Sequence, residues 1–234
     1  MGDKAMQALR LERWREAAAR YAERLLVDPE DAVARCNHAV ALYEQDRWQD
    51  AAAAFEELVR REGPLGEATV PALFSLGYCH LELHEHLKAL AATTLFLELA
   101  NQDHPFYWDG IQNTACAYSR LGHQRESVAL FRTVLGVRPH IYVFNGLALA
   151  LAGLGRPREA LFVLETARAR GFWDAVLENS LAHVQEQTKL PARSTRLVAK
   201  PWARARILRT SFRLLGWDGE PLTPRTIPWR VDQG

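Results

Sequence analysis

The sequence predicts an all-α protein in which antiparallel helix pairs stack into a solenoid. The first observation is a small residue that recurs within one short phrase at steps of 34, 38, 38 and 33 residues, at Ala17, Ala51, Ala89, Ser127 and Ala160. The second is another small residue twelve positions upstream of the last four, at Ala39, Gly77, Ala115 and Ala148, a series that Ala182 continues. Self-similarity at such a period is typical of repeat architectures.

Each stretch between these markers has the pattern of a helix. Apolar residues recur at the spacing of one helix face, as in the run from Leu73 to Leu81. Proline interrupts the pattern at regular places: Asp28-Pro29, Gly63-Pro64, His104-Pro105 and Arg138-Pro139. Because proline ends the helical hydrogen-bond ladder and suits the first turn of a helix, each break is expected to separate one helix pair from the next.

The small residues have a physical role in such a pair. Two antiparallel helices approach closely only where both carry a small side chain at their crossing point. The predicted crossing pairs are Ala39/Ala51, Gly77/Ala89, Ala115/Ser127 and Ala148/Ala160. The bulky residue four positions after the second small one should fill the gap toward the next unit, at Tyr21, Phe55, Phe131 and Leu164. In the third unit Thr93 occupies this slot, and Phe96 is expected to supply the bulk.

This pattern resembles the tetratricopeptide repeat family, whose unit is a helix–turn–helix of about 34 residues. The resemblance covers roughly residues 4–188: a partial first unit with a short helix at 4–11, four full units, and an unpaired last helix over 175–189. It implies a right-handed superhelical solenoid over residues 1–190, followed by a separate basic segment over 191–234. The alternative is a non-repetitive bundle of alanine-rich helices.

The resemblance also implies a binding groove, because the first helices of such pairs line a concave surface. The residues expected there are Val33, Cys36, Asn37, Val40, Tyr43, Phe74, Tyr78, Asn113, Cys116, Tyr142, Asn145 and Leu149. Asparagine recurs on four of the helices, at 37, 113, 145 and 179. Since an amide both donates and accepts hydrogen bonds, such a ladder suits an extended peptide. Alternatively, these amides satisfy neighbouring helix ends or face solvent.

One binding mode of the family is not expected. Members that capture the carboxyl terminus of heat-shock chaperones use a clamp of Lys, Arg and Asn on these helices. The corresponding faces of the two central units carry Cys36, Val40, Pro71 and Phe74, with no Lys or Arg. Co-chaperone function of that kind is therefore not predicted.

The charge of the chain is unevenly distributed. Residues 191–234 carry nine basic and three acidic side chains, and residues 1–190 carry 20 basic and 25 acidic ones. A helix is expected over 202–215, with Trp202, Ile207, Leu208, Phe212 and Leu215 roughly on one side. This helix would cap the end of the solenoid. Alternatively it binds an anionic membrane or nucleic acid, or the segment folds back onto the acidic solenoid.

No enzymatic chemistry is predicted, and no catalytic residue, metal or cofactor is expected. The 234 residues contain neither a phosphate-cradling glycine loop nor a nucleophile elbow. His80, His84 and His86, beside Cys79, have a metal-like spacing but are interpreted as surface turn residues. Three cysteines without paired spacing indicate reduced thiols. With neither a membrane-spanning run nor a signal sequence, the protein is expected in the cytoplasm.

The function predicted from these features is protein binding. The leading hypothesis is a cytoplasmic scaffold, an adaptor or chaperone, that holds a partner polypeptide of unknown identity in the groove. A rival hypothesis is an assembly factor that associates with nucleic acid or an anionic membrane through residues 193–213. A third is a homodimer in which the groove contacts a second copy.

Overall fold

A computed structural model of the chain describes residues 4–63, 66 and 68–188. The expected helix over 202–215 and the rest of 189–234 lie outside the described residues. The described part contains eleven helices: α1 (Lys4–Arg10), α2 (Trp14–Val27), α3 (Ala32–Tyr43), α4 (Trp48–Glu62), α5 (Thr69–Glu82), α6 (His86–Leu99), α7 (Tyr107–Arg120), α8 (Gln124–Val137), α9 (Ile141–Gly153), α10 (Pro157–Ala169) and α11 (Ala175–Thr188). The predicted all-α helix-pair architecture is confirmed.

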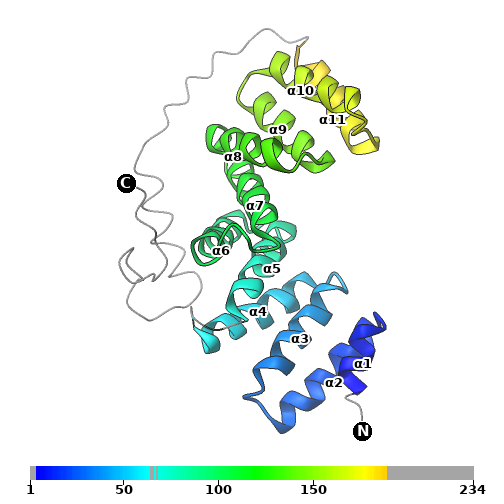
Figure 1. The fold of residues 1–234 in the computed structure, drawn as a ribbon, viewed down its shortest axis with the longest axis vertical. Helices are drawn as coiled ribbons and strands as arrows, with labels where there is room; N and C mark the ends of the chain where they lie inside the picture. Colours follow the sequence, from blue (N-terminus) through cyan, green and yellow to red (C-terminus); the bar gives the residue numbers. More distant parts are fainter. Residues whose placement is uncertain (1–3, 64–65, 67, 189–234) are drawn as a thin grey trace.

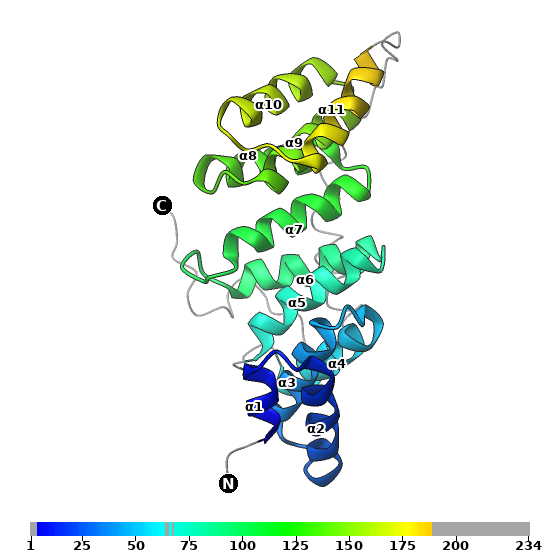
Figure 2. The same ribbon diagram turned by 90° about the vertical axis from the view of Figure 1, so that its right-hand side faces the viewer.

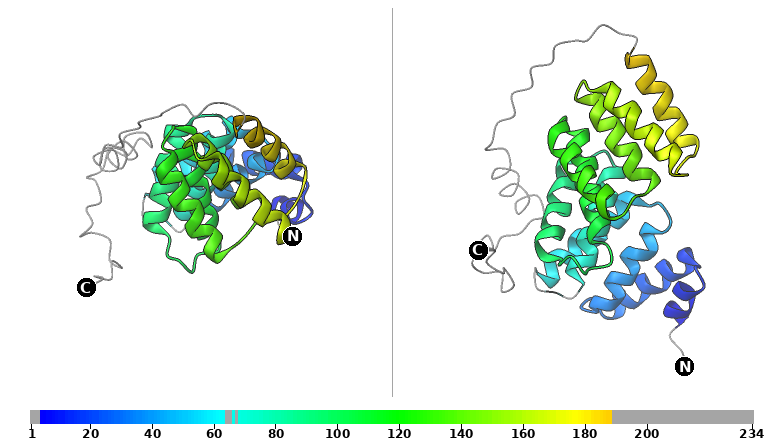
Figure 3. Two further views of the ribbon diagram at one scale, coloured as in Figure 1. Left: turned by 90° about the horizontal axis from the view of Figure 1, so that it is seen from above. Right: turned by 45° about the horizontal axis from the view of Figure 1, so that its top comes forward.

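The helices form an arc with α1 and α11 at its two ends (Figure 1). Each helix packs on the next in the chain, and the first helices of neighbouring pairs also touch, so that α3, α5, α7, α9 and α11 form a continuous inner row. Figure 2 views the arc from its open side, and Figure 3 shows the same stack from above and tilted. The inner row therefore forms the floor of any groove on the concave side.

The predicted crossing points are confirmed by burial. The three pairs Ala39/Ala51, Ala148/Ala160 and Ala115/Ser127 have no exposed surface, and Ala89 is equally buried opposite Gly77. A Cβ atom on Gly77 would lie 2.4 Å from Cγ2 of Thr93. Thr93 therefore replaces a bulky residue because its methyl group already fills the space above the glycine.

Two of the bulky residues contact the following unit at glycines, as the sequence predicts. A Cβ on Gly146 of α9 would lie 2.2 Å from Cζ of Phe131, and one on Gly110 of α7 would lie 2.3 Å from Cε1 of Phe96. The two rings lie at different distances from the crossing residue of their own helix. Phe96 follows Ala89 at a position three residues later than the one at which Phe131 follows Ser127. Gly110 lies three residues earlier than Gly146, relative to Ala115 and Ala148. In antiparallel helices these two shifts compensate, so each ring still meets a glycine, Phe131 with its tip and Phe96 with one edge.

The turn inside each helix pair has one conserved form along the chain. In each turn, the residue five positions before the small residue of the second helix has positive φ. These residues are Glu12, Asp46, His84, Gly122 and Gly155. The next residue donates its N–H to the carbonyl five positions upstream, at 2.9–3.2 Å in all five units. This is the Schellman arrangement, which satisfies carbonyls at a helix end. The first three units therefore place a side chain in a conformation that favours glycine.

The core of the described part lies wholly within residues 5–184, in three buried clusters that follow the stack. The first cluster spans the units up to α6, the second spans α7 to α11, and a small third one joins α6 to α7. Among the described residues, none of the helices combines the length and apolar character needed to cross a bilayer. Residues 4–188 thus carry their own hydrophobic core.

Candidate binding groove

The inner row is positioned by local signals that begin its helices. Asp31 caps α3: its Oδ1 accepts from the backbone N–H of Ala34 at 2.8 Å, and its Oδ2 lies 2.5 Å from Nε of Arg24 on the preceding helix. A capping carboxylate satisfies an otherwise unpaired helix N–H. The bond from Ala34 holds the pKa of Asp31 below its usual value against the opposing effect of burial, and Arg24 lowers it further. Asp31 thus fixes α3 to the first unit.

Three aromatic rings form a cluster where α3, α4 and α5 meet. We call Tyr43, Trp48 and Tyr78 the aromatic cluster. The centroid of Tyr43 lies 5.4 Å from that of Trp48 and 5.8 Å from that of Tyr78, and the Trp48 and Tyr78 rings are 5.7 Å apart, all edge to face. Edge-to-face contacts of this kind are favourable. All three side chains are half-buried, so the cluster is rigid and still reaches solvent.

Sequence analysis placed Tyr43 and Tyr78 in the groove but missed Trp48. Trp48 is the first residue of α4, a second helix, and the expectation considered first helices alone. The position of a tryptophan directly after the turn, next to the end of an inner helix, is the signal that could have indicated its contact with Tyr43.

Carboxylates surround the aromatic cluster. Burial raises the pKa of Tyr78, and Glu82, one helical turn on, raises it further by its charge and by a hydrogen bond with the hydroxyl, with a smaller effect from Asp46. Burial is also the largest cause that raises the pKa of Tyr43. Smaller contributions to this increase come, in decreasing order, from Tyr78, Cys79, Glu44 and Glu82. We call Glu44, Asp46 and Glu82, all exposed, the acidic rim.

Other predicted groove residues expose apolar surface along the inner row. Val33 on α3 is 60% exposed, Tyr142 on α9 is 56% exposed, and Leu149, also on α9, is 38% exposed. Tyr142 is among the groups that raise the pKa of Tyr78, after burial and the nearby carboxylates. The two tyrosines therefore lie within electrostatic range of each other although their helices belong to the third and fifth units.

The asparagines of the predicted ladder are engaged within the protein to different extents. Asn37 donates its amide to the Tyr21 hydroxyl at 3.2 Å, and Asn145 accepts from the Ser180 hydroxyl at 2.5 Å. Asn113 is only 7% exposed, whereas Asn179 on α11 is exposed. The bonds of Asn37 and Asn145 join neighbouring helices through side chains, and neither bond is made to a helix end. Among the described residues, neither of these two amides makes a second side-chain hydrogen bond.

The remaining predicted residues are half-buried in the floor of the inner row. Phe74 stacks on Phe106 with centroids 4.9 Å apart and an interplanar angle of 9°. Val40, Cys36 and Cys116 are also half-buried, and Gly146 faces Phe131. Burial raises the pKa of the Cys116 thiol to about 11, and burial followed by Glu62 raises that of Cys36. These thiols are protonated near neutral pH and serve as small apolar groups.

The histidine cluster was interpreted as surface turn residues, which is wrong for His80. His80 is almost completely buried, with Nδ1 2.8 Å from Glu85 and Nε2 3.4 Å from Glu56. It therefore links the turn of its own unit to α4 of the preceding one. His84 is exposed in the turn, with its ring 5.9 Å from that of His86. Throughout the described ranges, the structure has no group of three or more His, Cys, Asp or Glu arranged to hold a metal ion.

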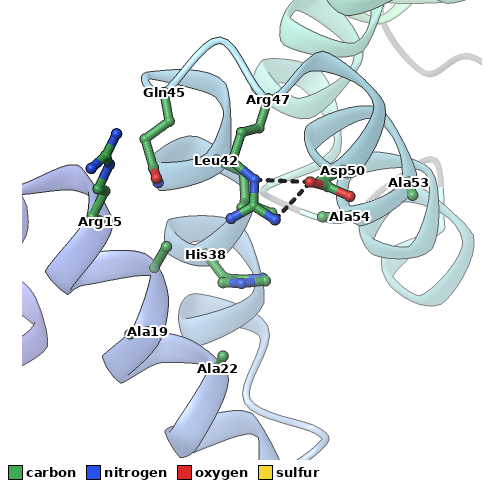
Figure 4. A pocket seen from close by; sticks show the side chains of 11 residues that line it. Arg15, Ala19, Ala22, His38, Leu42, Gln45, Arg47, Asp50, Ala53 and Ala54 are labelled. Atoms are coloured by element: carbon green, nitrogen blue, oxygen red, sulfur yellow. Dashed lines mark hydrogen bonds and ion pairs between the residues drawn. The ribbon is translucent and has the colours of Figure 1, made fainter.

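A separate hollow of about 710 Å³ opens between α2 and α4, with α3 beneath it (Figure 4). Alanines 19, 22, 53 and 54 form much of its walls, and His38 and Gln45 point into it. Burial, followed by Arg47, lowers the pKa of His38. Arg47 is paired with Asp50 at 2.6 Å, and Gln45 donates to the carbonyls of Ala41 and Trp14. The polar groups here are mostly satisfied within the protein.

Comparison with known proteins fits this geometry. A sequence profile described as tetratricopeptide repeat matches residues 3–67 and 36–104. The helix pairs within residues 3–104 are tetratricopeptide repeats. Beyond the matched residues the same crossing points and turns continue to residue 160, and α11 completes the stack. A comparison of the sequence with curated proteins finds no match.

Solved structures of tetratricopeptide repeat proteins share the fold at low sequence identity. A protein from Parabacteroides merdae superposes with a TM-score of 0.65 at 14% identity, covering 93% of this chain and 78% of its own. YrrB, described as having an unusual peptide-binding site, gives 0.62 at 18% identity, covering 80% and 89%. MamA gives 0.60 at 16% identity, covering 81% and 98%. At these identities the likeness establishes the fold alone.

Proposed function

We propose that this tetratricopeptide repeat protein is a non-enzymatic scaffold that holds a segment of a partner polypeptide on its inner surface, as an adaptor or chaperone in the cytoplasm. Its repeats are of a kind that generally supports protein–protein interaction. The observation that carries the proposal is the half-buried aromatic cluster, with the exposed apolar side chains of Val33, Tyr142 and Leu149 on the same row of helices. Rigid aromatic side chains that reach solvent beside apolar neighbours are the usual anchors of protein interfaces.

The chemistry of this surface favours an extended or helical peptide with apolar and basic side chains. Exposed apolar groups offer contacts for anchor residues, and the free atoms of the Asn37 and Asn145 amides offer hydrogen bonds to a peptide backbone. YrrB, a structure with the same fold, is described as binding a peptide, which is compatible with such a role. The division into a solenoid over 1–190 and a basic segment over 191–234 forms part of the proposal.

A selection experiment tests the location of binding. Random displayed peptides are selected on the purified full chain, and the best are measured by fluorescence anisotropy on Tyr142→Ala. Because Tyr142 is 56% exposed, its truncation leaves the core intact, and we expect at least a tenfold loss of affinity. The matched control is Phe162→Ala, since Phe162 is 70% exposed on α10, a second helix, and lies outside the inner row.

Two results would overturn the proposal. One is a failure to select any peptide that binds saturably. The other is a set of peptides whose affinity falls on Phe162→Ala and is unchanged on Tyr142→Ala, which would place binding on the other face of the stack. Circular dichroism and urea midpoints equal to those of the wild type verify that neither substitution alters the fold.

A further inference from the structure

The acidic rim has no cationic partner in the described part of the chain. Some of the other acidic side chains in the described repeats lie within 4 Å of an arginine, lysine or histidine, as Glu57 does with Arg60 and Asp109 with Arg138. No such pair involves Glu44, Asp46 or Glu82 within residues 4–63, 66 and 68–188. These three exposed carboxylates therefore make no ion pair with the described residues, although Arg13, Arg15 and Arg47 line the same hollow as Glu44 and Asp46. A cation placed over such rings gains from the ring quadrupole as well as from the carboxylates.

The complementary charge is present in the same chain. Between residues 189 and 213 the sequence has eight basic residues and no Asp or Glu, six of them arginine. The planar guanidinium of arginine stacks on aromatic faces and pairs with carboxylates through a fixed fork of donors, which the ammonium of lysine does not. The net charge is +6 over residues 191–234 and −5 over residues 1–190, so the two parts of the chain are opposite in sign.

The length of this segment suffices to reach the aromatic cluster. Along the inner row, three contacts between neighbouring first helices separate α11 from α5, and packed helices lie about 8–10 Å apart, so the path is roughly 30 Å. The 25 residues from Lys189 to Arg213 span up to roughly 80 Å when extended. A covalently attached segment also binds at an effective concentration on the order of millimolar.

We propose that the arginine-rich segment 193–213 of this chain occupies the inner groove, with an arginine side chain between the aromatic cluster and the acidic rim. The segment acts as an internal competitor that a partner displaces, so the availability of the groove is set by the difference between the two affinities. This proposal rests on the proposed function, because it assigns the same surface.

The test uses a labelled synthetic peptide of residues 193–213 and fluorescence anisotropy. The peptide is titrated into the full chain and into a chain ending at residue 190, which retains the whole described core. We expect binding to the shorter chain at least tenfold tighter than to the full chain, in which the attached segment already occupies the site. A peptide in which all arginines are replaced by lysine should bind the shorter chain at least threefold more weakly, since stacking is lost while charge is kept.

The location is tested by charge reversal in the shorter chain. Glu82→Lys should weaken peptide binding at least tenfold. Glu165→Lys, an equal change of charge at an exposed position on α10, should alter it less than twofold. Equal effects of the two substitutions would reduce the interaction to diffuse attraction and overturn the proposal, as would the absence of saturable binding. Urea midpoints of both variants report whether the fold is kept.

The two proposals fail in different ways. If displayed peptides bind in a manner that depends on Tyr142 while the 193–213 peptide does not bind, the groove is a binding surface and the internal competitor is excluded. If neither binds, both proposals fall. If the 193–213 peptide binds only to anionic vesicles or to nucleic acid, the basic segment has an external target and the internal contact is again excluded.

Discussion

Replacing Gly146 with alanine tests the ring–glycine contact that joins the fourth and fifth units. The added Cβ would lie 2.2, 2.4 and 2.8 Å from three ring atoms of Phe131, whereas ordinary contacts are 3.4–4 Å. The ring therefore has to retreat by more than 1 Å in a close-packed core, where it has almost no exposed surface. Overpacking of this kind typically lowers the free energy of unfolding by about 1–3 kcal/mol.

A double-mutant cycle separates this clash from a general loss of packing. Phe131→Leu alone removes the ring atoms that would meet the new Cβ, at a cost of about 1–2 kcal/mol, less than the 3–5 kcal/mol typical of truncation to alanine. In the double variant the alanine has room, so we expect it to be no less stable than Phe131→Leu, with a coupling of about 1–3 kcal/mol. Urea unfolding followed by circular dichroism measures all four proteins.

Gly136 provides the control, because it lies in helix α8 with open space where a Cβ would be placed. Alanine there should stabilise the protein by roughly 0.5–1 kcal/mol, the usual helix preference over glycine. The reasoning would be refuted if Gly146→Ala also stabilised the protein, or if the effects of Gly146→Ala and Phe131→Leu added within about 0.5 kcal/mol.

Three further predictions concern a turn, a cap and a thiol. His84→Gly should raise the free energy of unfolding by about 0.5–1 kcal/mol, because His84 has a φ of 58°, and Gly122→Ala, at the same turn position, should lower it by about 1–2 kcal/mol; similar urea midpoints for both would contradict this. The pKa of Asp31 is lowered chiefly by a backbone N–H of α3, so the stabilisation from its carboxylate is present above the usual value of 3.8 and is lost as pH falls through the lower folded value. The difference in free energy of unfolding between the wild type and Asp31→Asn, measured at a series of pH values, should therefore shrink over that range. A constant difference would exclude the effect. Burial raises the pKa of Cys79 to about 12, so mass spectrometry after iodoacetamide treatment at neutral pH should show Cys79 unmodified while half-buried Cys36 reacts first; the opposite order would contradict the burial.

The repeat could be predicted from the sequence because its signals are local and recur. Small residues at fixed spacing mark the crossing of two helices, and the pairs around Ala39 and Ala148 lie where they were expected. The small residue Thr93, at the position where other units carry a bulky side chain, was harder to explain. Its size depends on Gly77, sixteen residues away, and the compensation became clear only when both sides of the contact were known.

The binding surface was less predictable because it depends on contacts between units. Helical spacing placed Tyr43 and Tyr78 on the inner row, but the position of Trp48 depends on how the second helix of one unit meets the first helix of the next. His80 was misplaced for a related reason. His84 lies in the turn and His86 begins α6, while the side chain of His80 extends between Glu85 in that turn and Glu56 on α4.

The shifted contact between Phe96 and Gly110 limits the modularity of the stack. Units of a regular array can be exchanged or duplicated because every junction is the same, but here the third unit presents its ring one helical turn away from the position used by the fourth. A third unit placed before α9 would press a phenylalanine onto a residue other than glycine, while Gly146 would face an unfilled space. The order of the units is thereby fixed by two side chains at a junction, and changes in repeat number would be tolerated only where both partners are moved together.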